Sequence, residues 1–141
     1  MTAAPISETY FTSPQISPDS FAEIKAFGIH KVICNRPDVE NPPELQSSVM
    51  EQAAKDAGLE FAYLPLTHNA MTLDVAQTQK DLIANSEGPV LAYCASGTRS
   101  TVIWAIGVAK EMPVDDILDT CQKAGYPLEG LRPTLNALQD S

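Results

Sequence analysis

The sequence reads GPVLAYCASGTRST over residues 88–101, and this stretch decides the fold. Its apolar run at residues 89–93 is typical of a strand that is covered on both faces of a parallel sheet. Cys94 follows at the expected end of that strand, and a helical pattern starts near Thr98. Between them lie three small residues, Ala95, Ser96 and Gly97. The order of strand, small-residue turn and helix indicates one βα unit of an α/β domain.

Outward from this unit, short β-rich runs alternate with helical patterns. The other expected strands are residues 10–12, 31–34 and 60–64. The expected helices are residues 18–27, 44–57, 73–84, 98–110 and 114–124, with a final turn near 134–138. Such alternation implies parallel strands joined by right-handed crossovers. We therefore expect one α/β domain over residues 1–141, with a core at about 9–138 and a central, mostly parallel four-stranded sheet flanked by helices.

This architecture predicts where a site would lie. Ligands of open α/β sheets bind beyond the carboxyl ends of the strands. The loops at that edge are residues 35–43, 65–71 and 94–99. We therefore expect functional side chains in these three loops.

The charge of the chain limits its partners. The 141 residues include 18 acidic and 9 basic side chains, which gives a net charge of −9. A chain of this charge is repelled by nucleic-acid backbones and by anionic membranes, so neither is expected as a partner. A small anion can bind only where local geometry overcomes this field, which makes the few arginines candidates for a site.

The opening residues and the cysteines indicate a cytoplasmic protein. Residues 1–7 carry no basic residue and no apolar core, so they do not resemble a signal peptide. The apolar stretch near residues 101–109 is too short to span a bilayer. The three cysteines, Cys34, Cys94 and Cys121, are far apart in sequence, so we expect free thiols in a reducing compartment.

The loop from Cys94 to Arg99 has the residue types of an anion site with a nucleophile. Small residues let backbone N–H groups turn inward as a nest, and Gly97 permits a positive φ. The helix that starts near Thr98 directs its positive end at the loop, which favours a thiolate at Cys94. Arg99 supplies a planar fork for an oxyanion. We also expect Ser100 or Thr101 to donate a hydroxyl hydrogen bond to the sulfur.

The remaining candidates are weaker. Arg36 follows a strand, so it either points to the Cys94 loop or forms a surface ion pair with Asp38 or Glu40. His68 either acts as an acid or orients substrate, or it is a solvated loop residue. Cys34 and Cys121 fall in apolar segments and are expected to be core thiols. Two isolated histidines and separated cysteines give no metal-ligand spacing, and we expect no metal and no cofactor.

Three stretches together resemble the phosphatase-like domain family that is fused to beta-lactamase-like hydrolases, within the cysteine-phosphatase superfamily. These stretches are YFTSPQI at residues 10–16, GIHKVICNRPD at 28–38 with Glu40, and GPVLAYCASGTRS at 88–100. The resemblance covers about residues 9–138. It implies a four-stranded fold like that of the protein-tyrosine and dual-specificity phosphatases, with the cysteine loop at its centre.

The loop departs from the phosphatase pattern of His-Cys, five residues and Arg. Tyr93 stands in place of the histidine, and only four residues separate Cys94 from Arg99. Four is the spacing that rhodanese-type sulfurtransferases have, and the shorter loop resembles theirs. The family's acid, an aspartate upstream of the cysteine, is also missing, because residues 65–71 contain no carboxylate. Asp74 lies just beyond, where it is expected to be a charge in the first turn of a helix.

These observations leave three functions open. The first, which the loop length favours, is a sulfurtransferase that forms a persulfide on Cys94, with a small anionic sulfur donor and a thiol acceptor as partners. The second is a phosphatase that hydrolyses a phosphoester through a cysteinyl-phosphate. The third is an anion-binding regulatory module without activity. In each of them Cys94, Arg99 and Ser100 form the centre, and Ala95, Ser96, Gly97, Thr98, Arg36 and His68 surround the anion.

Overall fold

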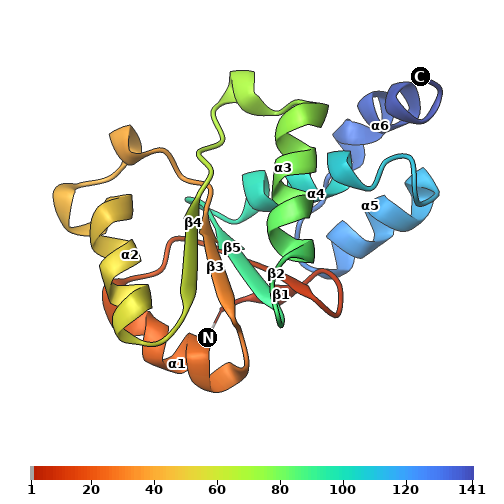
Figure 1. Ribbon diagram of the computed structural model, residues 1–141. Coiled ribbons are helices and arrows are strands. Elements are labelled where there is room, and N and C mark those ends of the chain that lie inside the picture. Colours follow the sequence, from red (N-terminus) through yellow and green to blue (C-terminus); the bar gives the residue numbers. More distant parts are fainter. Residues whose placement is uncertain (1) are drawn as a thin grey trace.

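Five strands form one sheet in the order β1–β2–β5–β3–β4 (Figure 1). The computed structural model describes residues 2–141. Its strands are β1 Ala4–Pro5, β2 Tyr10–Ser13, β3 Lys31–Cys34, β4 Glu60–Tyr63 and β5 Val90–Tyr93. β2, β5, β3 and β4 run parallel, and β1 pairs antiparallel with β2. The predicted mostly parallel α/β fold is therefore confirmed.

The predicted strand number of four was wrong by one. The additional strand, β1, consists of only Ala4 and Pro5 and pairs at the edge of the sheet. Two residues are too few to show the alternating pattern by which a strand is recognised in a sequence. A proline also argues against a strand, except at an edge, where its missing N–H does no harm.

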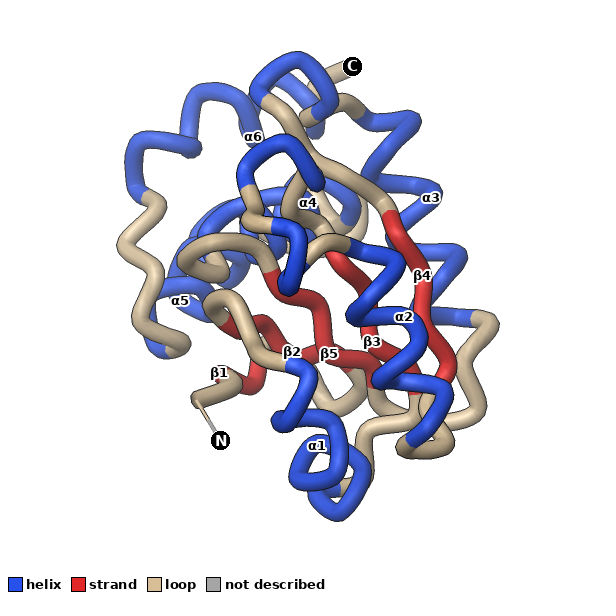
Figure 2. The backbone as a smooth tube through the Cα atoms, turned by 90° about the vertical axis from the view of Figure 1, so that its left-hand side faces the viewer, coloured by secondary structure: helices blue, strands red, loops and turns tan. Residues whose placement is uncertain are grey.

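Helices cover both faces of the sheet (Figures 1 and 2). One face carries α1 and α2, and the other carries α3 to α6. Their bounds are α1 Phe21–Phe27, α2 Ser47–Asp56, α3 Leu73–Ala84, α4 Thr98–Gly107, α5 Val114–Lys123 and α6 Arg132–Gln139. Short 3-10 turns lie at Pro18–Ser20, Asp38–Glu40, Pro43–Leu45, His68–Ala70 and Glu129–Leu131. No helix within residues 2–141 has the length and apolarity needed to cross a membrane.

The central strand β5 joins the two halves of the core. All four of its residues are buried, as the apolar run predicts. Val90 and Ala92 pack with the helices α4 and α5, whereas Leu91 and Tyr93 pack with α1 and α2. The strand that leads into the Cys94 loop is thus fixed from both sides.

A buried polar network lies beneath the loop and connects four elements. The Asn35 amide group, just after β3, exchanges hydrogen bonds of 3.1 and 3.0 Å with the Gln79 amide of α3. Gln79 Nε2 also donates to the hydroxyl of Tyr10 at 3.0 Å, and Tyr10 donates to the carbonyl of Ser100 at 2.7 Å. Ser100 Oγ closes the network by donating to Asn35 Oδ1 at 2.8 Å. All four residues are at most 1% exposed, so each would leave an unsatisfied partner if it were removed.

We predict that Gln79→Ala lowers the free energy of unfolding by about 2–4 kcal/mol, because it orphans buried groups on Asn35 and Tyr10 and leaves a cavity. Urea unfolding followed by circular dichroism measures the change. The matched control is Gln77→Ala on the exposed side of the same helix, where the side chain bonds only Asp81. We expect the control to change stability by less than about 0.5 kcal/mol; equal losses in the two variants would contradict the role of the network.

Candidate active site

The Cys94 loop is anchored to the strand ends on either side of it. Cys94 N–H donates to the carbonyl of Ser13 at 3.3 Å, and Gln15 N–H donates to the carbonyl of Ala95 at 3.2 Å. On the other side, Asn35 N–H donates to the carbonyl of Tyr93 at 2.8 Å. The carboxyl ends of the parallel strands therefore meet at this loop, where the topology predicts a site.

Cys94 is fully buried, and its sulfur accepts a backbone hydrogen bond. Gly97 N–H points at Sγ with a distance of 3.1 Å. Gly97 has φ of +92° and stands immediately before the first residue of α4, Thr98. A sulfur that faces a backbone N–H at the start of a helix lies where a negative charge is stabilised.

Gly97 is required for its conformation and for its surroundings. A side chain there would be strained by the positive φ, and a Cβ would collide with the hydroxyl of Tyr126, which follows α5. The Tyr126 hydroxyl donates to the carbonyl of Ser96 at 3.4 Å. Tyr126 thus packs against the loop at Ser96 and Gly97, a contact that no sequence pattern indicates.

Arg99 is held on one edge of its guanidinium. Nη1 and Nη2 donate to the two carboxylate oxygens of Glu40 at 2.8 and 2.7 Å, and Nη1 also donates to the carbonyl of Leu66 at 2.9 Å. This pairing lowers the pKa of Glu40 and, with a smaller contribution from Cys94, raises the pKa of Arg99. The second bidentate edge of the fork is formed by Nε and the other N–H of Nη2, since Nη2 carries two N–H groups and the Glu40 pair takes one of them. Arg99 therefore connects the Asp38–Glu40 turn to the cysteine loop.

Arg36 contacts the same carboxylate. Its Nε lies 3.4 Å from Glu40 Oε1, its Nη2 donates to the Glu40 carbonyl at 3.1 Å, and its Nη1 donates to Gln15 Oε1 at 3.3 Å. Of the two alternatives for Arg36, the structure shows the ion pair with Glu40. Since Glu40 also holds Arg99, this ion pair belongs to the surroundings of the Cys94 loop. Asp38 instead accepts hydrogen bonds from the backbone N–H and hydroxyl of Ser47.

Neither expected hydroxyl bonds the sulfur. Ser100 Oγ donates to Asn35, and Thr101 Oγ1 bonds the Gly97 carbonyl at 2.9 Å and the Thr12 hydroxyl at 3.0 Å. The expectation of a hydroxyl–sulfur bond was wrong, because the first turn of α4 directs both side chains into the core. Ser100 therefore does not bond the sulfur and instead anchors the start of α4 to the buried network through Asn35 and Tyr10.

The remaining members of the loop lie at its rim. Ala95 and Ser96 are exposed, and Ser96 Oγ donates to the Thr98 hydroxyl at 3.0 Å. Tyr93, which stands where phosphatases have histidine, points instead into the core beside α1 and α2. Cys34 and Cys121 are fully buried, and burial raises the pKa of each thiol, in Cys121 to about 11. Both lie in the core, as the sequence predicts.

His68 lies at the same edge of the sheet, in the exposed turn His68–Ala70. Its loop is tied to the site through Leu66, whose N–H donates to the carbonyl of Asn35 at 2.8 Å and whose carbonyl accepts from Arg99. Asp74 lies in the first turn of α3, where an acidic residue favours the helix. The 65–71 loop thus offers a histidine, and no carboxylate, on the nucleophile's side of the sheet.

Comparisons with known proteins agree on one kind of domain. The family model of the phosphatase-like domain of beta-lactamase hydrolase-like proteins matches residues 4–111. The beta-lactamase hydrolase-like protein of Agrobacterium fabrum is 28% identical over 130 residues, which are 91% of this chain and 30% of that protein. Its counterpart in Xylella fastidiosa is 33% identical over 101 residues, which are 72% of this chain and 23% of that protein. The chain thus spans less than a third of the length of either relative.

Solved structures give the same result. A putative phosphatase of Neisseria meningitidis superimposes with a TM-score of 0.87 and 34% identity, covering 98% of this chain and 99% of that one. The core catalytic domain of a PP-IP phosphatase from S. cerevisiae superimposes with a TM-score of 0.70 and 13% identity, covering 96% and 84%. At this identity the second structure shows a shared fold.

We predict that Glu40→Gln loosens Arg99 and weakens the binding of inorganic phosphate several-fold, measured by NMR titration. It should also lower stability at neutral pH by less than about 1 kcal/mol, because the ion pair is partly exposed. The pKa of Glu40 is lowered in the folded chain, so its stabilisation exists above the ordinary carboxyl pKa and disappears as pH falls through the folded value. The stability difference between the two proteins should therefore vanish in acid.

The matched control for this prediction is Glu44→Gln, in the neighbouring exposed turn. It should leave phosphate binding unchanged, and stability should follow the wild type at every pH. A Glu40→Gln protein that binds phosphate as well as the wild type does would show that Arg99 needs no partner.

Proposed function

The chain belongs to the family of phosphatase-like domains found in beta-lactamase hydrolase-like proteins, and from this premise we propose that it hydrolyses phosphate monoesters through a phosphorylated Cys94. The observation that carries the proposal is the buried Cys94 sulfur, with the Gly97 N–H aimed at it and Arg99 beside it. The sulfurtransferase expected from the loop length finds no support in the comparisons, which favour the phosphatase alternative. The four-residue spacing from Cys94 to Arg99 is therefore weaker evidence about the reaction than the family to which the chain belongs.

The reaction has two steps. In the first, the Cys94 thiolate attacks phosphorus, the S–P bond forms, the P–O bond to the alcohol breaks, and the alcohol leaves with a proton from an acid. In the second, water attacks the cysteinyl-phosphate and gives its proton to the deprotonated acid, the S–P bond breaks, inorganic phosphate leaves, and the thiolate and the acid are restored. Both transition states gather negative charge on the equatorial phosphoryl oxygens.

The backbone of the loop and the Arg99 side chain together stabilise this negative charge. Backbone N–H groups of the loop surround the phosphoryl oxygens, and Arg99 adds two donors through its Nε–Nη2 edge. Glu40 occupies the adjacent Nη1–Nη2 edge, so it orients the fork and leaves Nε and one N–H of Nη2 for the phosphoryl group. Glu40 is thus a positioning residue for Arg99.

We assign the proton of the leaving alcohol to His68. The pKa of Glu40 is lowered by its arginines, so Glu40 remains a carboxylate at neutral pH and cannot donate. His68 lies in the loop whose Leu66 carbonyl contacts Arg99. It is the titratable side chain of the 65–71 segment.

The first test follows phosphate release from a chromogenic aryl phosphate, together with the intact mass of the protein. Cys94→Ser should abolish release. Arg99→Lys should lower kcat/KM by about 10²–10³-fold, because a lysine cannot replace the bidentate fork. The matched control, Arg132→Lys, alters an exposed arginine that pairs with Asp115 and Glu129 and should leave the rate unchanged. A sulfur atom gained by Cys94 from thiosulfate, without phosphate release, would instead establish sulfur transfer. The absence of both reactions would indicate a binding module.

The second test concerns His68. An acid matters most when the leaving alkoxide is basic. We therefore expect His68→Gln to slow hydrolysis of an alkyl phosphate by about 10²-fold and that of p-nitrophenyl phosphate by less than about 3-fold. Equal effects on both esters would assign His68 a role other than proton donation. Asn69→Ala, in the same exposed turn, is the control and should change neither rate.

A further inference from the structure

The turn Asp38–Glu40 carries the carboxylate that holds Arg99, and it lies just beyond the end of β3. Glu40 N–H donates to the carbonyl of Pro37 at 3.0 Å, which closes the turn locally. This bond fixes the shape of the turn but not its place relative to the sheet. Contacts to other elements supply that place, and they therefore decide where Glu40 meets the guanidinium.

Tyr63, the last residue of β4, anchors this turn to the sheet. Its hydroxyl accepts a hydrogen bond of 2.9 Å from the N–H of Asp38. Asp38 is the first residue of a 3-10 turn, where the backbone N–H has no acceptor within the turn, so the phenol oxygen satisfies it. Tyr63 is 41% exposed and contributes little to the core. Desolvation raises the pKa of its hydroxyl, which is therefore uncharged at neutral pH.

The two carboxylates of the turn have separate partners. Both oxygens of Asp38 accept hydrogen bonds from Ser47 at the start of α2, one from its N–H at 2.7 Å and the other from its hydroxyl at 2.8 Å. Glu40 instead pairs with Arg99. The hydroxyl of Tyr63 and the first residue of α2 together fix one orientation of the turn, in which Glu40 faces the guanidinium.

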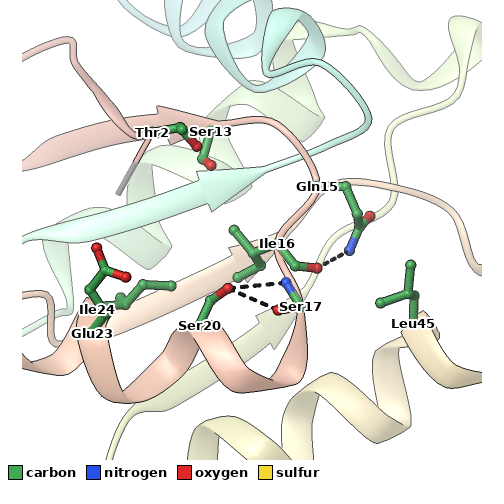
Figure 3. Close-up of a pocket in the computed structure, with 9 residues that line it drawn as sticks. All are labelled: Thr2, Ser13, Gln15, Ile16, Ser17, Ser20, Glu23, Ile24 and Leu45. Atoms are coloured by element: carbon green, nitrogen blue, oxygen red, sulfur yellow. Dashed lines mark hydrogen bonds between the residues drawn. The ribbon is translucent and has the colours of Figure 1, made fainter.

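A second tether reaches Glu40 from the opposite side of the site. Arg36 Nε lies 3.4 Å from Glu40 Oε1, and Arg36 Nη1 donates to Gln15 Oε1 at 3.3 Å. Gln15 is itself fixed at the edge of a cavity of about 390 Å³, where its Nε2 donates to the carbonyl of Ile16 at 2.8 Å (Figure 3). Glu40 therefore keeps one tether when the other is removed, so the loss of one tether should loosen the Arg99 fork without releasing it.

We propose that Tyr63 is a positioning residue for Arg99, on which it acts through the Asp38–Glu40 turn. Its hydroxyl holds the turn, and the turn holds Glu40 against the Nη1–Nη2 edge of the guanidinium. β3 lies between β4 and the strand that leads to Cys94, so the turn is the path by which Tyr63 influences the site. The inference rests on the proposed function in one respect, namely that the Arg99 fork binds the phosphoryl group.

The test removes one hydroxyl. Tyr63→Phe keeps the ring, changes no charge at neutral pH, and deprives the Asp38 N–H of its acceptor. We expect this variant to bind inorganic phosphate about 3–5-fold more weakly in an NMR titration and to lose a similar factor in kcat/KM for p-nitrophenyl phosphate. Val39→Ala is the matched control, because Val39 lies in the same turn and is 93% exposed, and it should change neither quantity. Urea unfolding confirms that each variant folds.

Two further measurements separate positioning from a general effect on stability. In ¹⁵N-labelled protein without phosphate, the ¹⁵N–¹H NOE of the Arg99 Nε–Hε group should fall in Tyr63→Phe and stay unchanged in Val39→Ala. In a Glu40→Ala background, Tyr63→Phe should weaken phosphate binding by less than about 1.5-fold, because its effect passes through Glu40. An equal loss in both backgrounds would overturn the proposal, as would a Tyr63→Phe protein with the Arg99 signal and phosphate affinity of the wild type.

The Arg99 signal also distinguishes this proposal from the activity on which it rests, because it is measured without substrate. If the wild type hydrolyses no ester and Tyr63→Phe still loosens Arg99, the proposed activity fails and the positioning role stands. If the wild type hydrolyses the ester and Arg99 is as rigid in Tyr63→Phe as in the wild type, the activity stands and the positioning role fails.

Discussion

The left-handed turn at Gly97 is the constraint on which the site depends. With φ at +92°, the chain leaves β5, directs the Gly97 N–H back at Cys94 Sγ, and starts α4 one residue later. Glycine permits this turn, and because it has no Cβ the hydroxyl of Tyr126 can pack in the space that a side chain of residue 97 would fill. Beneath it, the network of Tyr10, Asn35, Gln79 and Ser100 fixes the first turn of α4 to two strands. The nucleophile is therefore preorganised by groups that never touch the substrate.

The anion site that we propose for this acidic chain depends on a local arrangement of charges. The net charge of −9 repels anions at a distance, but solvent and salt screen it over about 10 Å. Within the site two arginines face one carboxylate, so Arg36, Arg99 and Glu40 together leave one positive charge. Backbone N–H groups add to it without adding a net charge. This local positive charge and these N–H groups are the basis of the phosphoryl site that we propose.

The sequence predicted the elements well and their long-range contacts poorly. The four main strands and the helix Leu73–Ala84 appear where their periodicity places them. The hydrophobic pattern that marks each element in the sequence is formed by the residues that the element buries in the core. Gln79 was missed because a polar residue in an amphipathic helix normally faces water, and its partner Tyr10 is distant in sequence. The hydroxyl of Ser100 was expected to bond the Cys94 sulfur but bonds Asn35 instead. Core packing sets how α4 is rotated about its axis, and a local sequence pattern does not reveal this rotation. The comparisons support the phosphatase alternative better than the preferred sulfur transfer, because a four-residue spacing is a local feature, whereas the family resemblance extends over most of the chain.

The contacts of Glu40 exclude it as a replacement for the missing aspartate. A carboxylate that orients an arginine must stay charged, whereas a carboxyl that protonates a leaving group must hold a proton; one residue with a lowered pKa cannot do both. In the reaction that we propose, the acid therefore comes from another loop at the same edge. The 65–71 loop is the one that Arg99 itself fixes, through the Leu66 carbonyl, while the Leu66 N–H bonds Asn35 of the buried network. The contacts that orient the Arg99 fork thus also hold the loop of His68, so the proposed acid and the proposed nucleophile would depend on the same few hydrogen bonds.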